Sequence, residues 1–443
     1  MAFKVLIAGG SVAGLTLALV LQSVNIEFEV LEKGDFAPQL GATIGIQPHG
    51  ARILDQLGVW DDIEPKAIPL RHRRFYDADM KLWDQDEVTG KISDFEGHQI
   101  IFVERCEFLR TLHSHIRDKS RLHACTELSS YVESESGVTV KTTEGKTFEG
   151  SILIGADGVH SKTRNLVAEK LQSENKKLCK ALQECYTSEF KCLFALTRVG
   201  PTLPLLPKGD TVFVYRKDHN SVAGTLKPGL VFWAFFVKTP LTRIPNCPRF
   251  TDEDMDALIE EYGDEEIVPG ATIRDFYKAR VRASLVSLEE GIVQKWSHGR
   301  VVLVGDAVHK VTINAGLGGN LAIEGVTRLM NQLVPLIQNN EDLSSDQLQG
   351  AFTQYEMAHK PRAKTTLAMS AATSRVESEQ NWLYNFASRW VQPVLSESMK
   401  MRPVTLYSLG GTYLNFLPLS SRTLLKLEEK RIDQNQSWVR SVL

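Results

Sequence analysis

The sequence lacks several features that would place it in a well-known class. Its six cysteines form no C-x-x-C pair and no zinc-like spacing, so no metal site is predicted and the thiols are expected to stay reduced inside the cell. The formal net charge is only −3, with acids and bases interspersed, which excludes the basic surface of a nucleic-acid-binding protein. A chain of 443 residues, 43% hydrophobic and 24% charged, is typical of a soluble globular protein with room for a buried site.

Long apolar segments are also missing. The N-terminal apolar run has no basic stretch before it and contains glycines, so it does not read as a secretory signal. The most apolar candidate for a membrane segment, residues 404–419, contains Gly410 and Gly411 and falls short of 18 uninterrupted apolar residues. We expect an intracellular protein, cytoplasmic or in peripheral contact with an internal membrane through its C-terminal region.

What the sequence does have begins with a glycine-rich turn inside VLIAGGSVAGLTLALVL, residues 5–21. The pattern predicts a strand over 3–8, a helix over 12–23 and a second strand over 26–31. A strand, a glycine turn, a helix and a strand within about 30 residues make a β-α-β unit with a right-handed crossover.

The residue types in this turn suit a bound phosphate group. Gly9 permits the tight turn, Gly14 lets the helix pack closely on the strand, and the N–H groups at the helix start favour a pyrophosphate. Ser11 stands at the middle position, where glycine is usual, and its small side chain still permits close approach. Glu32, which ends the second strand, can accept hydrogen bonds from an adenosine ribose, the alternative being a solvated acid on a turn. Lys33 follows it and is grouped with the cofactor-binding residues.

Two further strand-to-loop turns follow along the chain. One is GADG at 155–158, after a strand predicted from residue 151, and the other is GDAVHKVTINAGLGGN at 305–320, after a strand predicted from residue 300. A helix is expected from about residue 319. An NAD dehydrogenase would need only the first β-α-β unit, so three such turns favour another dinucleotide.

The pattern of residues in the middle of the chain predicts a second sheet. Strands are predicted over 190–198, 211–216 and 230–238, and LVFWAFFVK in the last is apolar on both faces, as for a sheet buried between a cavity and a helical layer. Residues 341–443 are expected to be helical. We expect four prolines to separate these helices: Pro361, Pro393, Pro403 and Pro418.

The set of three motifs resembles the class A flavoprotein monooxygenases, which have the para-hydroxybenzoate hydroxylase-like fold, over residues 3–333. The resemblance implies an α/β protein with a Rossmann-like FAD-binding domain, an inserted mixed β-sheet substrate domain and C-terminal helices. The implied boundaries are 1–180 with 285–340 for the FAD-binding domain, 181–284 for the substrate-binding sheet domain and 341–443 for the C-terminal helical region.

The resemblance also assigns cofactor residues. It places Gly9, Gly14 and Glu32 at the ADP half of FAD, Asp306 at the ribityl or pyrophosphate region, and the loop up to Asn320 at the isoalloxazine ring. The alternative for Asp306 is a turn or helix-capping acid. Three glycines keep side chains clear of that ring, and the helix start would stabilise negative charge on the reduced flavin. These glycines are Gly316, Gly318 and Gly319.

Further positions follow from the resemblance. Arg105, in the strand-to-helix turn of FVERCEFLRTL, is implied at the FAD pyrophosphate, and an arginine at a helix start is otherwise unfavourable next to the helix dipole. Gly45 would leave room beside the flavin. Asp157 and Gly158, followed by Arg164, match a motif linked to both FAD and NADPH binding.

Several segments, among them VERCEFLRTL and GDAVHKVTINAGLGGNLAIEGVTRL, look like one subgroup, the fungal FAD-dependent epoxidases of meroterpenoid and indole-diterpene pathways. This likeness implies epoxidation of a prenyl alkene with FAD as cofactor, NADPH as reductant and O₂ as co-substrate. It also implies an active-site role for Tyr215, the alternative being a structural sheet tyrosine. Two positions depart from the family pattern, which usually has proline where this chain has Ile313 and commonly glutamine where it has Leu317.

Aromatic residues of the predicted central sheet are expected to wall the substrate pocket, ordinary core packing being the alternative for each. They are Phe194, Phe213, Trp233 and Phe235. The expected partner is a hydrophobic small molecule, bound by a monomer or weak dimer. Two other activities stay open, namely hydroxylation of a phenol or indole by the same flavin chemistry, and a flavin-binding homologue that carries out non-redox isomerisation or cyclisation.

Overall fold

The N-terminal β-α-β unit forms the centre of a six-stranded sheet in the computed structural model, which describes residues 3–39, 41, 43–200, 203–204, 206–340 and 342–430. The predicted elements are β1 (Lys4–Ala8), α1 (Val12–Ser23) and β2 (Glu27–Leu31), and β1 pairs in parallel with β2. The order is β19-β20-β11-β1-β2-β7. The other strands are β7 (Leu122–His123), β11 (Ile152–Gly155), β19 (Ser297–His298) and β20 (Val301–Leu303).

The predictions of strands near residues 151 and 300 are confirmed, because β11 pairs in parallel with β1 and β20 pairs in parallel with β11. All four residues of β11 and all three of β20 are buried, as expected for a parallel sheet covered on both faces. Consequently β1, β2, β11 and β20 end at one edge of the sheet, and the turns that follow them meet there.

Helices and a small sheet surround this core. The helices are α5 (Arg105–His115), α6 (Lys162–Lys170) and α7 (Lys176–Gln183), and the three-stranded sheet is β8 (Leu128–Glu133), β9 (Val138–Thr142) and β10 (Thr147–Gly150). Two short strands, β3 (Thr43–Ile46) and β6 (Ile101–Glu104), pair in antiparallel fashion beside the cavity described below. The remaining helices of the first hundred residues are α2 (Pro48–Gln56), α3 (Trp60–Ile63) and α4 (Val88–Glu96).

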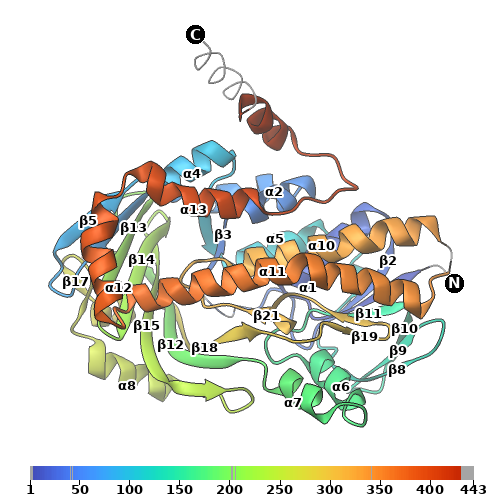
Figure 1. The fold of residues 1–443 in the computed structure, drawn as a ribbon. Helices are drawn as coiled ribbons and strands as arrows, with labels where there is room; N and C mark the ends of the chain where they lie inside the picture. Colours follow the sequence, from blue (N-terminus) through green and yellow to red (C-terminus); the bar gives the residue numbers. More distant parts are fainter. Residues whose placement is uncertain are drawn as a thin grey trace.

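An eight-stranded sheet makes the other half of the molecule (Figure 1), in the order β21-β18-β12-β15-β14-β13-β4-β5. Its strands are β4 (His72–Tyr76), β5 (Leu82–Asp86), β12 (Thr187–Arg198), β13 (Asp210–Arg216), β14 (His219–Lys227), β15 (Leu230–Arg243), β18 (Arg280–Ile292) and β21 (His309–Lys310). The three predicted strands are confirmed as β12, β13 and β15. The sheet does not follow the expected boundaries at 180 and 285, because β4 pairs with β13 across a long stretch of sequence.

The far face of this sheet is covered by α8 (Asp252–Tyr262), α9 (Ile273–Lys278) and the hairpin of β16 (Glu266–Val268) and β17 (Ala271–Thr272). The near face borders the cavity. Both faces of β15 are therefore buried from Val231 to Val237, as its unbroken apolar run predicts.

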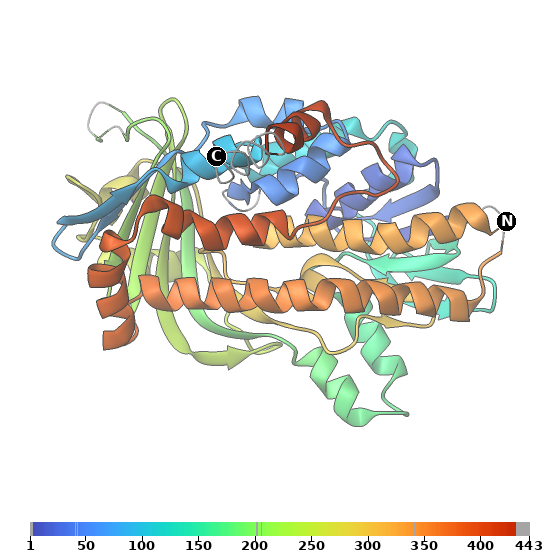
Figure 2. The ribbon, with the colours of Figure 1, turned by 45° about the horizontal axis from the view of Figure 1, so that its top comes forward.

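The C-terminal part of the chain contains two long helices, α10 (Gly318–Asn339) and α11 (Ser345–Glu377). The short α12 (Trp382–Phe386) and α13 (Glu397–Leu409) follow them. With 33 residues, α11 is about 50 Å long, and it contacts β19 of the first sheet and β13 and β18 of the second. Figures 1 and 2 both show α11 running alongside α10 toward the larger sheet. Across the described residues, no helix combines the length and the apolar character needed to cross a membrane.

The expectation of a helical C-terminal region is confirmed by α11, α12, α13 and a further helix over residues 421–430, whereas residues 341 and 431–443 lie outside the described residues. The expectation that Pro361 and Pro403 separate helices is wrong, because Pro361 lies inside α11 and Pro403 inside α13. An internal proline costs a helix about 3 kcal/mol. Around Pro361 this cost is offset by buried packing of the same helix, including Tyr355 and Ala363.

The close contact of α1 with β1 gives a test of the fold. In Gly14→Ala, the new Cβ would lie 1.9 Å from the Gly9 carbonyl oxygen, so backbone must move and we expect the free energy of unfolding to fall by about 1–3 kcal/mol. The matched control is Gly350→Ala, on the exposed face of α11 with open space around the added Cβ, which should raise stability by at most about 1 kcal/mol. Equal unfolding midpoints for the two variants would contradict this packing.

Candidate cofactor and substrate site

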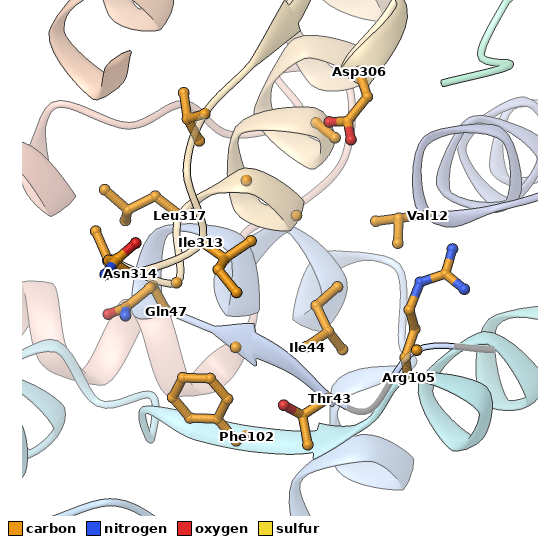
Figure 3. Close-up of a pocket in the computed structure, with 18 of the residues that line it drawn as sticks. Val12, Thr43, Ile44, Gln47, Phe102, Arg105, Asp306, Ile313, Asn314 and Leu317 are labelled. Carbon is orange, nitrogen blue, oxygen red and sulfur yellow. The ribbon is translucent and has the colours of Figure 1, made fainter. Parts of the chain in front are cut away.

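One continuous cavity of about 1080 Å³ reaches from the carboxyl edge of the six-stranded sheet to the near face of the eight-stranded sheet. Single small-molecule sites usually measure about 300–1,000 Å³, so this cavity has room for a large ligand and a further molecule. All three glycine-containing turns predicted to bind a dinucleotide border it, from the ends of β1, β11 and β20. Figure 3 shows residues from distant parts of the chain facing one another across it.

At one end of the cavity, the start of α1 meets Arg105. Within the described chain, the first turn of α1 has no side-chain cap and no acidic residue, so its N–H groups point toward the cavity with the positive end of the helix dipole. Arg105 donates a hydrogen bond to Ser11 Oγ over 2.7 Å, and its guanidinium lies beside Val12 (Figure 3). The serine at this position, where glycine is usual, therefore orients Arg105 through its hydroxyl group.

The positive charge of Arg105 has no ion-pair partner among the described residues. Burial lowers the pKa of the guanidinium, and the nearby carboxylates of Asp306 and Glu32 oppose that change. An unpaired, partly buried cation beside a helix start is a site for an anion such as a pyrophosphate. The residues at this end therefore fit the phosphate portion of FAD.

Glu32 lies at the cavity next to this anion site. One of its carboxylate oxygens accepts a hydrogen bond from the Gly10 N–H over 2.6 Å, and the other accepts one from the Gly34 N–H over 3.0 Å. These bonds fix the carboxylate at the end of β2. Because each oxygen has a further lone pair, Glu32 can still accept hydrogen bonds from ribose hydroxyls. Lys33 is exposed at the rim of the same cavity.

Gly9 makes the junction between strands possible. Its backbone has φ of +106°, and a Cβ there would lie 2.4 Å from the Ala156 carbonyl oxygen, so glycine alone fits between β1 and the turn after β11.

Side-chain hydrogen bonds from α6 and from the residues before it fix the GADG turn. Asp157 accepts hydrogen bonds from the N–H and hydroxyl of Thr163, both over 2.8 Å, and from the hydroxyl of Ser161. Arg164 is buried and donates to three backbone carbonyl groups, those of Val159, Leu182 and Ala307. Asp157 and Gly158 border the cavity, but these bonds show that Asp157 and Arg164 first of all fix the shape of the turn.

Asp306 belongs to a short 3-10 turn, Gly305–Ala307, at the upper edge of the view in Figure 3. Its carboxylate accepts a hydrogen bond from Lys310 Nζ over 2.6 Å. The pair is partly exposed to the cavity, so Asp306 is available to hydroxyl groups of a ligand. The backbone oxygen of Asp306 also accepts a bond from the buried Tyr186 hydroxyl, which fixes the turn.

The loop before α10 reaches the cavity with glycines and apolar side chains. Gly45, Gly316, Gly318 and Gly319 all border the cavity, as expected. Gly316 has φ of +64°, and its N–H donates to the Ile313 carbonyl over 2.8 Å, so the loop closes without the usual proline. Figure 3 shows the Ile313 side chain pointing into the cavity.

The expectation that Asn320 contacts the cofactor is wrong, because this residue is completely buried and does not border the cavity. Its Oδ1 accepts from the Gln47 N–H over 2.9 Å, and its Nδ2 donates to the carbonyls of Gly45 and Gly316 over 3.0 and 2.9 Å. Asn320 therefore clamps β3 against the loop before α10 and positions Gly45 and Gly316 from behind.

The aromatic wall of the sheet is partly as expected. Phe194 and Phe213 border the cavity. The expectation for Phe235 is wrong, because side chains alternate along β15 and its ring packs on the far face, 5.3 Å from the ring centre of Tyr262. Trp233 borders the cavity, but its ring belongs to the same far core and its indole N–H donates to Thr197. Phe232 and Phe236 supply the wall in their place.

Tyr215 shares the cavity face of β13 with Phe213, as predicted. Its ring packs against Phe75 and Trp83, with centroid distances of 5.9 and 5.7 Å. Burial raises the pKa of the Tyr215 hydroxyl well above its usual range. The hydroxyl has no hydrogen-bond partner among the described residues, so it is free to donate to a ligand in the cavity.

Several lining residues had no signal in the sequence. Phe102 of β6 stacks on Phe232 with a centroid distance of 4.5 Å, and Ile44 comes from the paired strand β3 (Figure 3). Arg73 and Phe75 come from β4, and Glu377 comes from the end of α11. These residues meet only through tertiary structure, so no local pattern or spacing could identify them.

The chain matches the sequence model of a family described as "FAD binding domain" over residues 2–367. It is 32% identical to the FAD-dependent monooxygenase dpasE of Apiospora sacchari, covering 100% of this chain and 94% of that protein. It is also 32% identical to the FAD-dependent monooxygenase ausM of Penicillium brasilianum, with coverage of 95% and 88%.

Among solved structures, a single-residue variant of HpxO from Klebsiella pneumoniae, complexed with FAD, superposes with a TM-score of 0.76 at 19% identity, covering 92% of this chain and 99% of that chain. This similarity confirms the expected fold. The chain therefore belongs to the FAD binding domain family, has the para-hydroxybenzoate hydroxylase-like fold and is a homologue of fungal FAD-dependent monooxygenases.

Proposed function

We propose that this protein is an FAD-dependent monooxygenase that epoxidises a prenyl alkene on a meroterpenoid or indole-terpenoid intermediate. In this reaction the alkene, O₂, NADPH and a proton give the epoxide, water and NADP⁺. The observation that carries the proposal is the single cavity that joins an anion site at Arg105 to an apolar chamber against the larger sheet.

Each part of FAD has residues that fit it. Glu32 would accept hydrogen bonds from the hydroxyl groups of the adenosine ribose. Arg105 and the first N–H groups of α1 would bind the pyrophosphate. Asp306 would accept a hydrogen bond from a hydroxyl group of the ribityl chain, and the loop up to Gly319 would border the isoalloxazine ring. When bound, FAD supplies the two-electron oxidation of NADPH and the activation of O₂.

The chamber supports an apolar substrate. Phe194, Phe213, Phe232 and Phe236 contribute its sheet wall, and Ile313 closes it from the loop before α10. These side chains would exclude water from the reacting centre and hold a flexible hydrocarbon chain against the loop. Tyr215 would donate a hydrogen bond to the substrate at the same wall.

Hydroxylation of a phenol or indole is the second candidate, because Tyr215 and Glu377 place two polar groups in the cavity. That chemistry gains from a base that removes the phenol proton. Burial raises the pKa of Glu377 to about 8, so its carboxyl group is mostly protonated at pH 7 and is a poor base. The charge state of Glu377 therefore favours an alkene over a phenol.

The cofactor assignment predicts the behaviour of two variants. We expect Glu32→Ala and Asp306→Ala each to weaken FAD binding by about tenfold to a hundredfold, because hydrogen bonds to a charged group contribute about 1.5–3 kcal/mol. The ratio of flavin to protein after purification and the Kd of FAD measure this effect.

Glu260→Ala is the control, because the Glu260 side chain is 85% exposed on α8 and does not border the cavity. It should keep full flavin occupancy. Unchanged occupancy in both Glu32→Ala and Asp306→Ala would remove these two assignments.

The reaction itself is tested with prenylated ring compounds, NADPH and ¹⁸O₂. We expect NADPH oxidation coupled to a product that gains one labelled oxygen, loses the alkene and keeps its aromatic ring intact. A hydroxylated ring with an intact alkene would support the second candidate instead. Bound flavin without NADPH oxidation for every substrate would favour a non-redox role, for which the unusual Ile313 is the supporting feature.

A further inference from the structure

We infer that Glu377 and Tyr215 form a hydrogen-bonding site for a neutral acceptor oxygen, a carbonyl or ether group, at the polar end of an otherwise apolar substrate. The inference rests on the proposed function, because it describes the substrate class of that same cavity. It goes beyond that function because it assigns a role in substrate specificity to Glu377, which lies more than fifty residues along the chain from the last sequence motif.

Glu377 is the last residue of α11 and is 5% exposed. One carboxyl oxygen, Oε2, accepts a hydrogen bond from Asn314 Nδ2 over 2.6 Å. Asn314 in turn accepts one from the Ser374 hydroxyl over 2.9 Å, and Ser374 contacts the hydroxyl of Thr312 over 2.8 Å. This chain of bonds fixes the loop beside the cavity to α11. The other carboxyl oxygen, Oε1, has no hydrogen-bond partner among the described residues.

Tyr215 lies on β13, which contacts α11, and both Tyr215 and Glu377 border the cavity. The rings of Phe75 and Trp83 hold the phenol in place without bonding to its hydroxyl. Tyr215 and Glu377 are both nearly buried, and each leaves one polar group without a partner in the described structure. Neither polar atom is sealed from the cavity, so a ligand or water there can satisfy it.

The charges around Glu377 are already neutralised. Arg73 of β4 makes two hydrogen bonds of 2.8 Å to Asp86, and Lys400 of α13 is 2.7 Å from Asp84. The next cation along the chain, Arg389, pairs with Glu379. With the described cations occupied, Glu377 has no counter-ion and keeps its proton near neutral pH.

A protonated carboxyl group and a phenol both donate. Because both groups offer an O–H donor, the site suits a neutral acceptor oxygen. A carboxylate is disfavoured because no unpaired cation faces it. The Asn314 bond ties this donor pair to the loop that borders the flavin site, so an anchored polar end would hold the attached hydrocarbon chain in register with that loop.

The test compares two probes in the FAD-loaded full-length protein, a geranylgeranyl-substituted cyclohexanone and the matched geranylgeranyl cyclohexane. Kd is measured from quenching of flavin fluorescence, without turnover. We expect the wild type to bind the ketone about tenfold to a hundredfold more tightly than the hydrocarbon. Glu377→Leu and Tyr215→Phe should each reduce that preference by about five- to tenfold and leave the Kd of the hydrocarbon unchanged.

Glu377→Gln separates donation from the structural role, since glutamine keeps the bond to Asn314 and still offers an N–H donor. It should retain most of the ketone preference. In the wild type, affinity for the ketone should fall as the pH rises through about 8, while Glu377→Gln should show no such change. Glu260→Gln, on exposed α8, is the matched control and should behave as the wild type at every pH.

Thermal unfolding gives a readout independent of any ligand. Because the pKa of Glu377 is raised to about 8 from 4.5, the unfolded chain releases this proton first as the pH rises. Glu377 therefore lowers stability progressively between those two pH values. The midpoint of Glu377→Gln relative to the wild type should rise across the same window and then level off.

An equal Kd for the two probes in the wild type, or a ketone preference that survives in Glu377→Leu and Tyr215→Phe, would overturn the inference. Failure of either probe to bind would also count against it. A different result would contradict the proposed function. A protein that prefers the ketone but consumes no NADPH with any substrate would have this binding site without the monooxygenase activity. Conversely, epoxidation without any ketone preference leaves the activity standing and removes the site.

Discussion

The meeting of four strand ends at one edge of the six-stranded sheet is the constraint on which the rest of the structure depends. Parallel pairing of β1, β2, β11 and β20 brings a glycine turn, a carboxylate and two further turns to one place, although they lie up to about three hundred residues apart. The start of α1 and Arg105, which has no ion-pair partner in the described part of the chain, then create a positive site. Such a site is stable only if solvent or a ligand anion compensates it.

The second sheet converts this anion site into a reaction chamber. Its near face supplies phenylalanine side chains, and its far face is sealed by α8 and α9, so the sheet serves as a rigid wall. Two asparagines attach the loop before α10 to its surroundings, Asn320 to β3 and Asn314 to α11. This loop touches both the predicted flavin site and the substrate chamber. Its position is therefore fixed by these side-chain hydrogen bonds, with Ile313 at the position where the sequence resemblance leads us to expect proline.

Local features of the fold could be predicted from the sequence because they repeat over short distances. The β-α-β unit shows a strand, a glycine turn and a helix in order, and Gly9, Ser11, Glu32 and Arg105 all lie at the cavity as expected. Side-chain direction was harder to predict. Residues 230–237 of β15 are all apolar, so no polar residue among them marks which face borders the cavity, and the expectation for Phe235 is therefore wrong.

The remaining site residues could not be predicted because tertiary contacts alone bring them together. Asn320 follows a glycine-rich loop typical of ligand contact, yet its amide turns back to bond β3. Glu377 ends a long helix among ordinary polar residues, and only the packing of α11 against β13 brings it to the cavity. Pro361 shows the same limit in secondary structure, because packing of α11 outweighs the local preference against an internal proline.

A crystal structure of the FAD-loaded protein tests the central claim most directly. The account predicts adenosine ribose oxygens within hydrogen-bond distance of Glu32, the pyrophosphate at the start of α1 beside Arg105, and the flavin ring against Gly316–Gly319 with the apolar chamber in front of it. Density for FAD at another place, or a ring directed away from the larger sheet with Arg105 contacting only solvent, would contradict it.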